Sequence, residues 1–144
     1  MADMKAKTQM QGGSGMKDIL VPLSPGELLD KITILRIKAA RMGDPLKVAN
    51  VRHELGLLEQ TWKDSGAAAV DLGNEEANLT LVNEKLWVIE DEIRDEERLK
   101  RFGEKFIELA RAVYVTNDER AAIKKRINTL LGSTIVEEKS YQSY

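Results

Sequence analysis

The chain has no cysteine, one histidine, and only two tryptophans, three tyrosines and two phenylalanines. Without cysteine, disulfides, thiolate catalysis and cysteine-ligated zinc are all excluded. His53 has no second histidine with which to build the ligand pairs of di-iron bundles. No spacing around it matches a catalytic triad. We therefore predict no metal site and no cofactor.

An excess of one charge and long apolar runs are also missing. The 22 basic and 24 acidic residues leave a net charge of −2, which argues against a general nucleic-acid binder or a membrane-surface protein. No apolar run approaches the roughly 18 residues that span a bilayer. The first residues lack the apolar core of a secretory signal. We expect a cytoplasmic protein without nucleic-acid or membrane partners.

The 144 residues fit one domain with two short flanking parts. Residues 1–16 have the composition of a flexible leader, because Gln11–Gly15 is rich in glycine and holds nothing large to bury. Residues 17–136 are expected to form a single helical domain, and residues 137–144 a charged tail. Short extended segments are expected near both ends of the domain, at residues 19–23 and 134–136.

Start and stop signals predict an all-α fold, an antiparallel bundle of four to five helices. Ser24-Pro25 and Asp44-Pro45 each combine a capping side chain with a proline suited to the first helical turn. The expected helices run from these caps to about residues 42 and 64, then from 74 or 75 to 101 and from about 104 to 131. The last one is either continuous or divided at Thr116–Asp118.

The first helix has apolar residues on too many sides for a surface helix. Leu28, Ile32 and Leu35 form one stripe, whereas Ile34 and Ile37 point to the opposite side. We therefore expect this helix at the centre of the bundle. The residues predicted to be buried are Leu28, Ile32, Leu35, Leu55, Leu58, Leu86, Ile89, Val113 and Ile127. Spare apolar surface at Ile34 and Ile37, and a third helix about two turns longer than its partners, predict a homodimer.

Polar and aromatic residues at steps of three and four form a column on each of the last two long helices. If these columns face each other near the charged residues of the first helix, they line a pocket for a small anionic or zwitterionic ligand. The alternative is a solvated network of ion pairs, which long helices often carry. The candidate ligand-binding residues are Asp30, Arg36, Trp87, Glu90, Arg94, Arg111, Tyr114 and Asp118.

Two functional hypotheses follow. The first is a non-enzymatic binding or scaffold protein that recognises another protein or a small anionic ligand. The alternative is a small cofactor-free enzyme that acts on a small anionic metabolite in a polar pocket between helices. An enzyme needs these charged residues to converge and lose water. A scaffold needs an exposed apolar patch with charges along its rim.

Several segments together resemble an uncharacterised family of small bacterial proteins, an all-helical domain of unknown function. They are VPLSPGELLDKITIL (21–35), NVRHEL (50–55), LWVIEDEIR (86–94), ARAVY with ND (110–114 and 117–118) and EEKSY (137–141). The resemblance covers nearly everything after residue 16. It implies a stand-alone helical domain and no particular activity.

Overall fold

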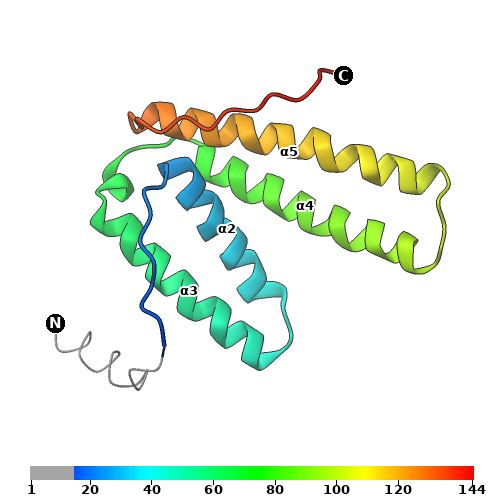
Figure 1. The fold of residues 1–144 in the computed structure, drawn as a ribbon, viewed down its shortest axis with the longest axis horizontal. Coiled ribbons are helices and arrows are strands. Elements are labelled where there is room, and N and C mark those ends of the chain that lie inside the picture. The colour runs from blue at the N-terminus through cyan, green and yellow to red at the C-terminus, as the bar shows by residue number, and fades with distance from the viewer. Residues whose placement is uncertain (1–14) are drawn as a thin grey trace.

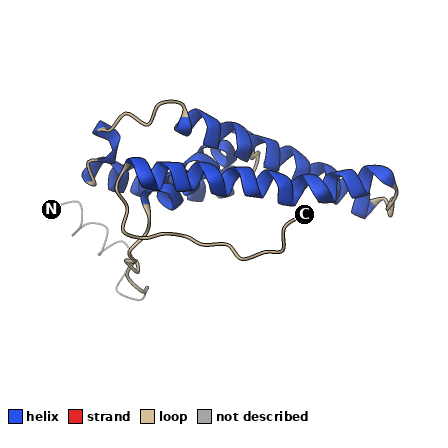
Figure 2. Cartoon of the chain, turned by 90° about the horizontal axis from the view of Figure 1, so that it is seen from above, coloured by secondary structure: helices blue, strands red, loops and turns tan. Residues whose placement is uncertain are grey.

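A computed structural model describes residues 15–144, which form four α-helices and one short 3₁₀ helix (Figures 1 and 2). This confirms the predicted all-α fold. The predicted leader lies outside the described residues except for Gly15 and Met16. No residue between 15 and 144 is in a strand, and the segments flanking the helices are extended but unpaired. The elements are α2 (Pro25–Arg41), α3 (Pro45–Asp64), η1 (Ala67–Ala69), α4 (Glu75–Arg98) and α5 (Glu104–Leu130).

The helices form two antiparallel hairpins, α2–α3 and α4–α5, with α2 between its neighbours (Figure 1). α2 packs against α3, α4 and α5, which confirms its predicted central place. Ile37 is buried within the single chain and Ile34 is half-buried. These two residues therefore do not provide the spare apolar surface that supported a dimer. The intramolecular neighbours of α2 already cover most of it.

The first turn of α2 is fixed by a cap and by a close approach to α5. The Glu27 backbone N–H donates to Oγ of Ser24, as the capping box predicts. The Gly26 N–H donates to Oδ1 of Asn128 on α5. A Cβ on Gly26 would lie 2.5 Å from the backbone oxygen of Lys124, so only glycine fits here.

The core follows the predicted seams closely. Leu28, Ile32, Leu35, Leu86, Ile89 and Ile127 are buried as expected. Leu55, Leu58 and Val113 were expected to be buried but are only half-buried. For Leu55 and Leu58 the reason is incomplete coverage, because α3 packs mainly on α2 and η1, and no other helix of residues 15–144 covers the remaining sides of α3. Apolar spacing identifies the inward face of a helix, not how completely other helices cover it.

The last two helices decide one open alternative and correct one predicted helix end. α5 is continuous from Glu104 to Leu130, so Asn117 and Asp118 lie inside it and start no fifth α-helix. α4 ends at Arg98 and not at 101, because Lys100 adopts a positive φ of 54° that stops the helix. With 24 and 27 residues, the two helices are ~36 and ~40 Å long. Their hairpin extends beyond the end of α2 (Figure 1).

Candidate functional site

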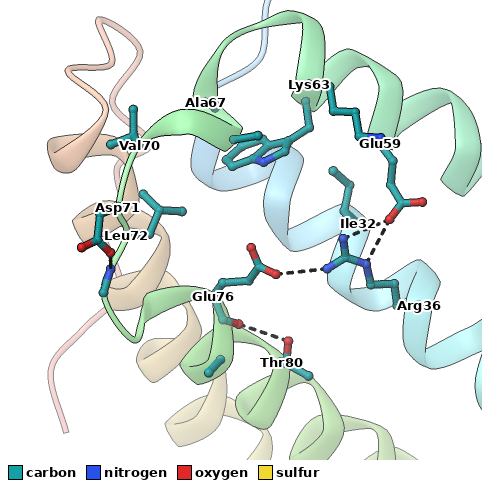
Figure 3. Close-up of a pocket in the computed structure, with 14 residues that line it drawn as sticks. Ile32, Arg36, Glu59, Lys63, Ala67, Val70, Asp71, Leu72, Glu76 and Thr80 are labelled. Carbon is teal, nitrogen blue, oxygen red and sulfur yellow. Dashed lines mark hydrogen bonds and ion pairs between the residues drawn. The ribbon is translucent and has the colours of Figure 1, made fainter.

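A groove of about 700 Å³ opens between α2, α3, the η1 loop and the start of α4 (Figure 3). Arg36 of α2 crosses it. Its Nε and Nη2 donate to Oε2 of Glu59 on α3 at 3.3 and 3.0 Å, and its Nη1 donates to Oε2 of Glu76 on α4 at 3.3 Å. One guanidinium therefore links three helices. A planar guanidinium suits this role because its donors point in several directions at once.

The groove combines an apolar floor with charges of both signs. Lys63 and Asp71 stand on its rim in addition to Arg36 and its two carboxylate partners (Figure 3). Two positive and three negative side chains thus surround it. The buried residues of the floor are Ile32, Trp62, Ala67 and Leu72.

The loop that closes the groove depends on two glycines and an aspartate. Gly66 follows α3 with a φ of 81°, and Gly73 precedes α4 with a φ of 61°, which residues with a Cβ rarely adopt. Oδ1 of Asp71 accepts a 2.8 Å hydrogen bond from the Gly73 N–H, the short-range bond by which aspartate stabilises turns. This arrangement buries Leu72 under the groove and leaves Asp71 exposed.

A second pocket, of about 580 Å³ and mostly apolar, adjoins the groove and shares Trp62, Ala67 and Val70 with it. Its outer wall is the extended segment 19–23, which forms no backbone hydrogen bond within residues 15–144. The side chains of this segment face water to a large extent, and the exposed fraction of Leu20 is 92%. We name the groove, this pocket and residues 19–23 together the corner surface.

Asp30, a predicted site residue, lies buried between α2 and α4 with an exposed fraction of 4%. Nδ2 of Asn83 donates to Oδ1 of Asp30 and to Oγ1 of Thr33, both at 2.9 Å. The Thr33 hydroxyl donates in turn to the backbone oxygen of Asp30. Buried polar groups that satisfy one another in this way fix the relative position of two helices.

Residues 19–144 match the model of a family of unknown function, DUF6165. The chain belongs to this family. The match confirms the family of unknown function identified from the sequence. The region that matches the DUF6165 model contains every element of the corner surface, all four α-helices and the C-terminal tail. The chain matches no curated protein and no solved structure.

The remaining predicted residues of this DUF6165 chain lie away from the groove. Glu90 and Arg94 pair with each other on the surface of α4, with 3.3 Å between Oε2 and Nη2. The Arg94 side chain is 77% exposed, as in a solvated ion pair. Trp87 is half-buried on the same helix, and Arg111 is exposed on α5. None of these four residues lines the groove.

The C-terminal tail brings Tyr114 and Asp118 together. The rings of Tyr114 and Tyr144 meet edge to face with 5.2 Å between centroids, and the Tyr144 hydroxyl donates to Oδ2 of Asp118 at 2.6 Å. Both residues line a cavity between α5 and the tail. Among the predicted site residues, Arg36 alone belongs to the corner surface.

The other groove charges were not predicted from the sequence. Each resembles an ordinary solvent-facing charge on a helix or turn, because a single sequence does not show which helices meet. One feature of the sequence marks the place of the groove. Trp62 is a large apolar residue in the last turn of α3, three residues before the helix stop at Ser65-Gly66. No group of three metal-ligating side chains is close enough to hold a metal ion within residues 15–144. The residues missed are Glu59, Lys63, Asp71 and Glu76.

Proposed function

We propose that this protein is a non-enzymatic binding protein, an adaptor or scaffold whose corner surface holds an apolar segment of another protein. The observation that carries the proposal is the composition of that surface. Leu20 and Val70 expose apolar side chains beside the buried Trp62, and charged residues border them on the groove side. Protein interfaces have this anatomy, an apolar centre with a polar rim.

The extended segment favours a peptide-like partner. The N–H and C=O groups of Ile19, Leu20 and Val21 have no backbone partner in the described chain. An extended peptide can pair with such a free edge and place alternate side chains in the adjoining pocket. Small ligands need a few convergent polar groups in their cavity. The corner surface is open and mainly apolar on this side, which supports a protein partner.

The state of the charges supports binding over catalysis. Arg36 is shared by two carboxylates, so its charge is already neutralised at the groove. Glu90 and Arg94 pair on the outside of α4. Asp30 is buried in the core, where it accepts a hydrogen bond from Asn83. A catalytic site needs such groups to converge on one substrate position, and these groups lie apart.

We also propose that the protein acts as a homodimer in the bacterial cytoplasm. The cysteine-free, highly charged composition supports the location. The dimer is supported by the α4–α5 hairpin, whose tip exposes Leu99, Phe102 and Ile107. A two-fold contact between two such hairpins would remove these side chains from water. Light scattering at micromolar concentration should give twice the monomer mass, and a monomer mass would contradict the dimer.

Site-specific crosslinking in cells tests the binding surface. A photoreactive residue placed at Leu20 or Val70 should form an adduct of one defined mass with a partner protein. Leu46 is the matched control, because it is also exposed and apolar but lies in the first turn of α3, outside the corner surface. Val70→Asp should remove the adduct formed from position 20. Equal adducts from position 46, or no adduct from either test position, would contradict the proposal.

A further inference from the structure

The C-terminal tail folds back along α5 (Figures 1 and 2), and side-chain contacts hold it there. Lys124 Nζ donates to Oε2 of Glu137 at 3.3 Å and lies 2.8 Å from its Oε1. Farther along, Lys139 pairs with Asp118 and the Tyr144 hydroxyl donates to the same carboxylate. The tail therefore places one of its carboxylates on Lys124.

Lys124 is an unusual partner because it is buried, with an exposed fraction of only 8%. Lysine is rarely so buried unless paired. Its other partner is Glu27 of α2, whose Oε2 lies 2.5 Å from Nζ. Burial alone would lower the pKa of Lys124, but the hydrogen bonds that it donates to Glu137 and Glu27 outweigh burial and raise it. Lys124 thus stays charged and holds two anionic groups, one of which the tail supplies.

A cavity of about 580 Å³ lies between α5 and the tail, next to this lysine. From α5 it is lined by Tyr114, Asn117, Arg120 and Lys124, whose polar groups include two cations. Arg120 pairs with no carboxylate of residues 15–144, although it faces the cavity. The α5 wall also includes Asp118, whose charge is already engaged by the tail.

The tail lines the cavity with charges of both signs, because Lys139 accompanies its two carboxylates. Lys139 pairs with Asp118, which leaves Arg120 as the unpaired cation of the α5 wall within residues 15–144. Glu137 and the following Glu138 both line the cavity from the tail side. A carboxylate delivered by the chain itself to a buried lysine occupies the position that the carboxylate of a free ligand would take. An unpaired arginine beside it leaves room for a second anionic group, which arginine binds through two donors.

We infer that this cavity is a binding site for a small molecule with two or more carboxylate groups, and that Glu137 competes with the ligand for Lys124. One ligand carboxylate replaces Glu137 on Lys124. A second carboxylate meets Arg120, and Tyr114 and Asn117 supply neutral hydrogen-bond donors. The site is separate from the corner surface and does not depend on the partner proposed there.

Calorimetric titration of citrate into the full-length protein tests this inference. A tethered group competes at an effective concentration of about millimolar, so Glu137→Gln should bind citrate about tenfold more tightly than the wild type. Arg120→Gln, made in the Glu137→Gln background, should lose this binding about tenfold. Arg120 has no ion pair to break in the described residues, so this variant should fold normally, and circular dichroism checks that it does.

Lys125→Gln in the same background is the matched control, because Lys125 is exposed on α5 and does not line the cavity. It should leave citrate binding unchanged. An equal loss from the Lys125 and Arg120 variants would show general charge attraction and overturn the inference. Equal citrate affinity of the wild type and Glu137→Gln would overturn the competition, and the absence of binding to both would overturn the site.

Discussion

The backbone N–H of Gly26 donates a 2.7 Å hydrogen bond to Oδ1 of Asn128, across 102 positions of the sequence. This bond joins the first turn of α2 to the last turn of α5. It satisfies one of the free N–H groups that every helix has at its start. The backbones approach so closely here that the glycine cannot carry a side chain without displacing the Lys124 carbonyl.

Gly26→Ala should therefore lower the free energy of unfolding by about 1–3 kcal/mol, the usual cost of overpacking. The added methyl group would meet Lys124 O at 2.5 Å and Asn128 Oδ1 at 2.8 Å. Gly56→Ala is the control, since Gly56 lies inside α3 with open space around it. Alanine there should stabilise the helix by about 0.5–1 kcal/mol. Urea unfolding of both variants measures the opposite signs, and equal effects would contradict the close approach.

A second prediction concerns the polar contact inside the core. Asn83→Ala removes the amide donor from Asp30 and Thr33, both of which are buried. The loss should cost about 2–3 kcal/mol, because a buried group left without its partner loses its hydration as well. Asn50→Ala, on the exposed side of α3, should change the unfolding free energy by less than ~0.5 kcal/mol. A small effect at position 83 would show that water replaces the amide.

The helices were predictable because their signals are local. Caps such as Ser24, breaks such as Gly43 and apolar stripes such as Leu28, Ile32 and Leu35 depend on neighbours in the sequence. The central place of α2 was also predictable, because the helix itself carries apolar residues on most of its sides. The same signals left α5 undecided at Asn117, which can cap a helix or continue one.

The site was harder to predict because it depends on contacts distant in sequence. Arg36 meets Glu59 and Glu76, which are 23 and 40 positions away, and nothing in one sequence links them. Asp30 was predicted to line a pocket as one of the charges of the first helix, which are costly to bury unless paired. The structure places it inside the core, where Asn83 of α4 donates to it, a pairing that spacing within either helix cannot indicate.

Arg36 and Arg94 should differ in their contributions to stability. Arg36 joins three helices and Arg94 joins two turns of one helix, although both are partly exposed. Exposed pairs contribute ~0–1 kcal/mol, so Arg36→Ala should cost about 1 kcal/mol and Arg94→Ala less than ~0.5 kcal/mol. The difference should shrink in 1 M salt, where screening acts over ~3 Å. Urea titrations at two salt concentrations measure it, and equal costs at low salt would show that the bridge across the groove adds nothing.

The pairing of Glu27 with Lys124 should make stability depend on pH. Burial acts to raise the pKa of Glu27, but the hydrogen bond and charge of Lys124 outweigh burial and hold that pKa below its usual value of 4.5. For a lowered pKa, the stabilisation is fully present above the pKa of the unfolded carboxyl and is lost as the pH falls through the folded value. Glu27→Gln should therefore be less stable than the wild type at pH 7. The two unfolding free energies should approach each other as the pH falls below 4.5 and through the lower folded pKa of Glu27, and a gap that does not narrow as the pH falls would show that the Glu27 charge does not cause it.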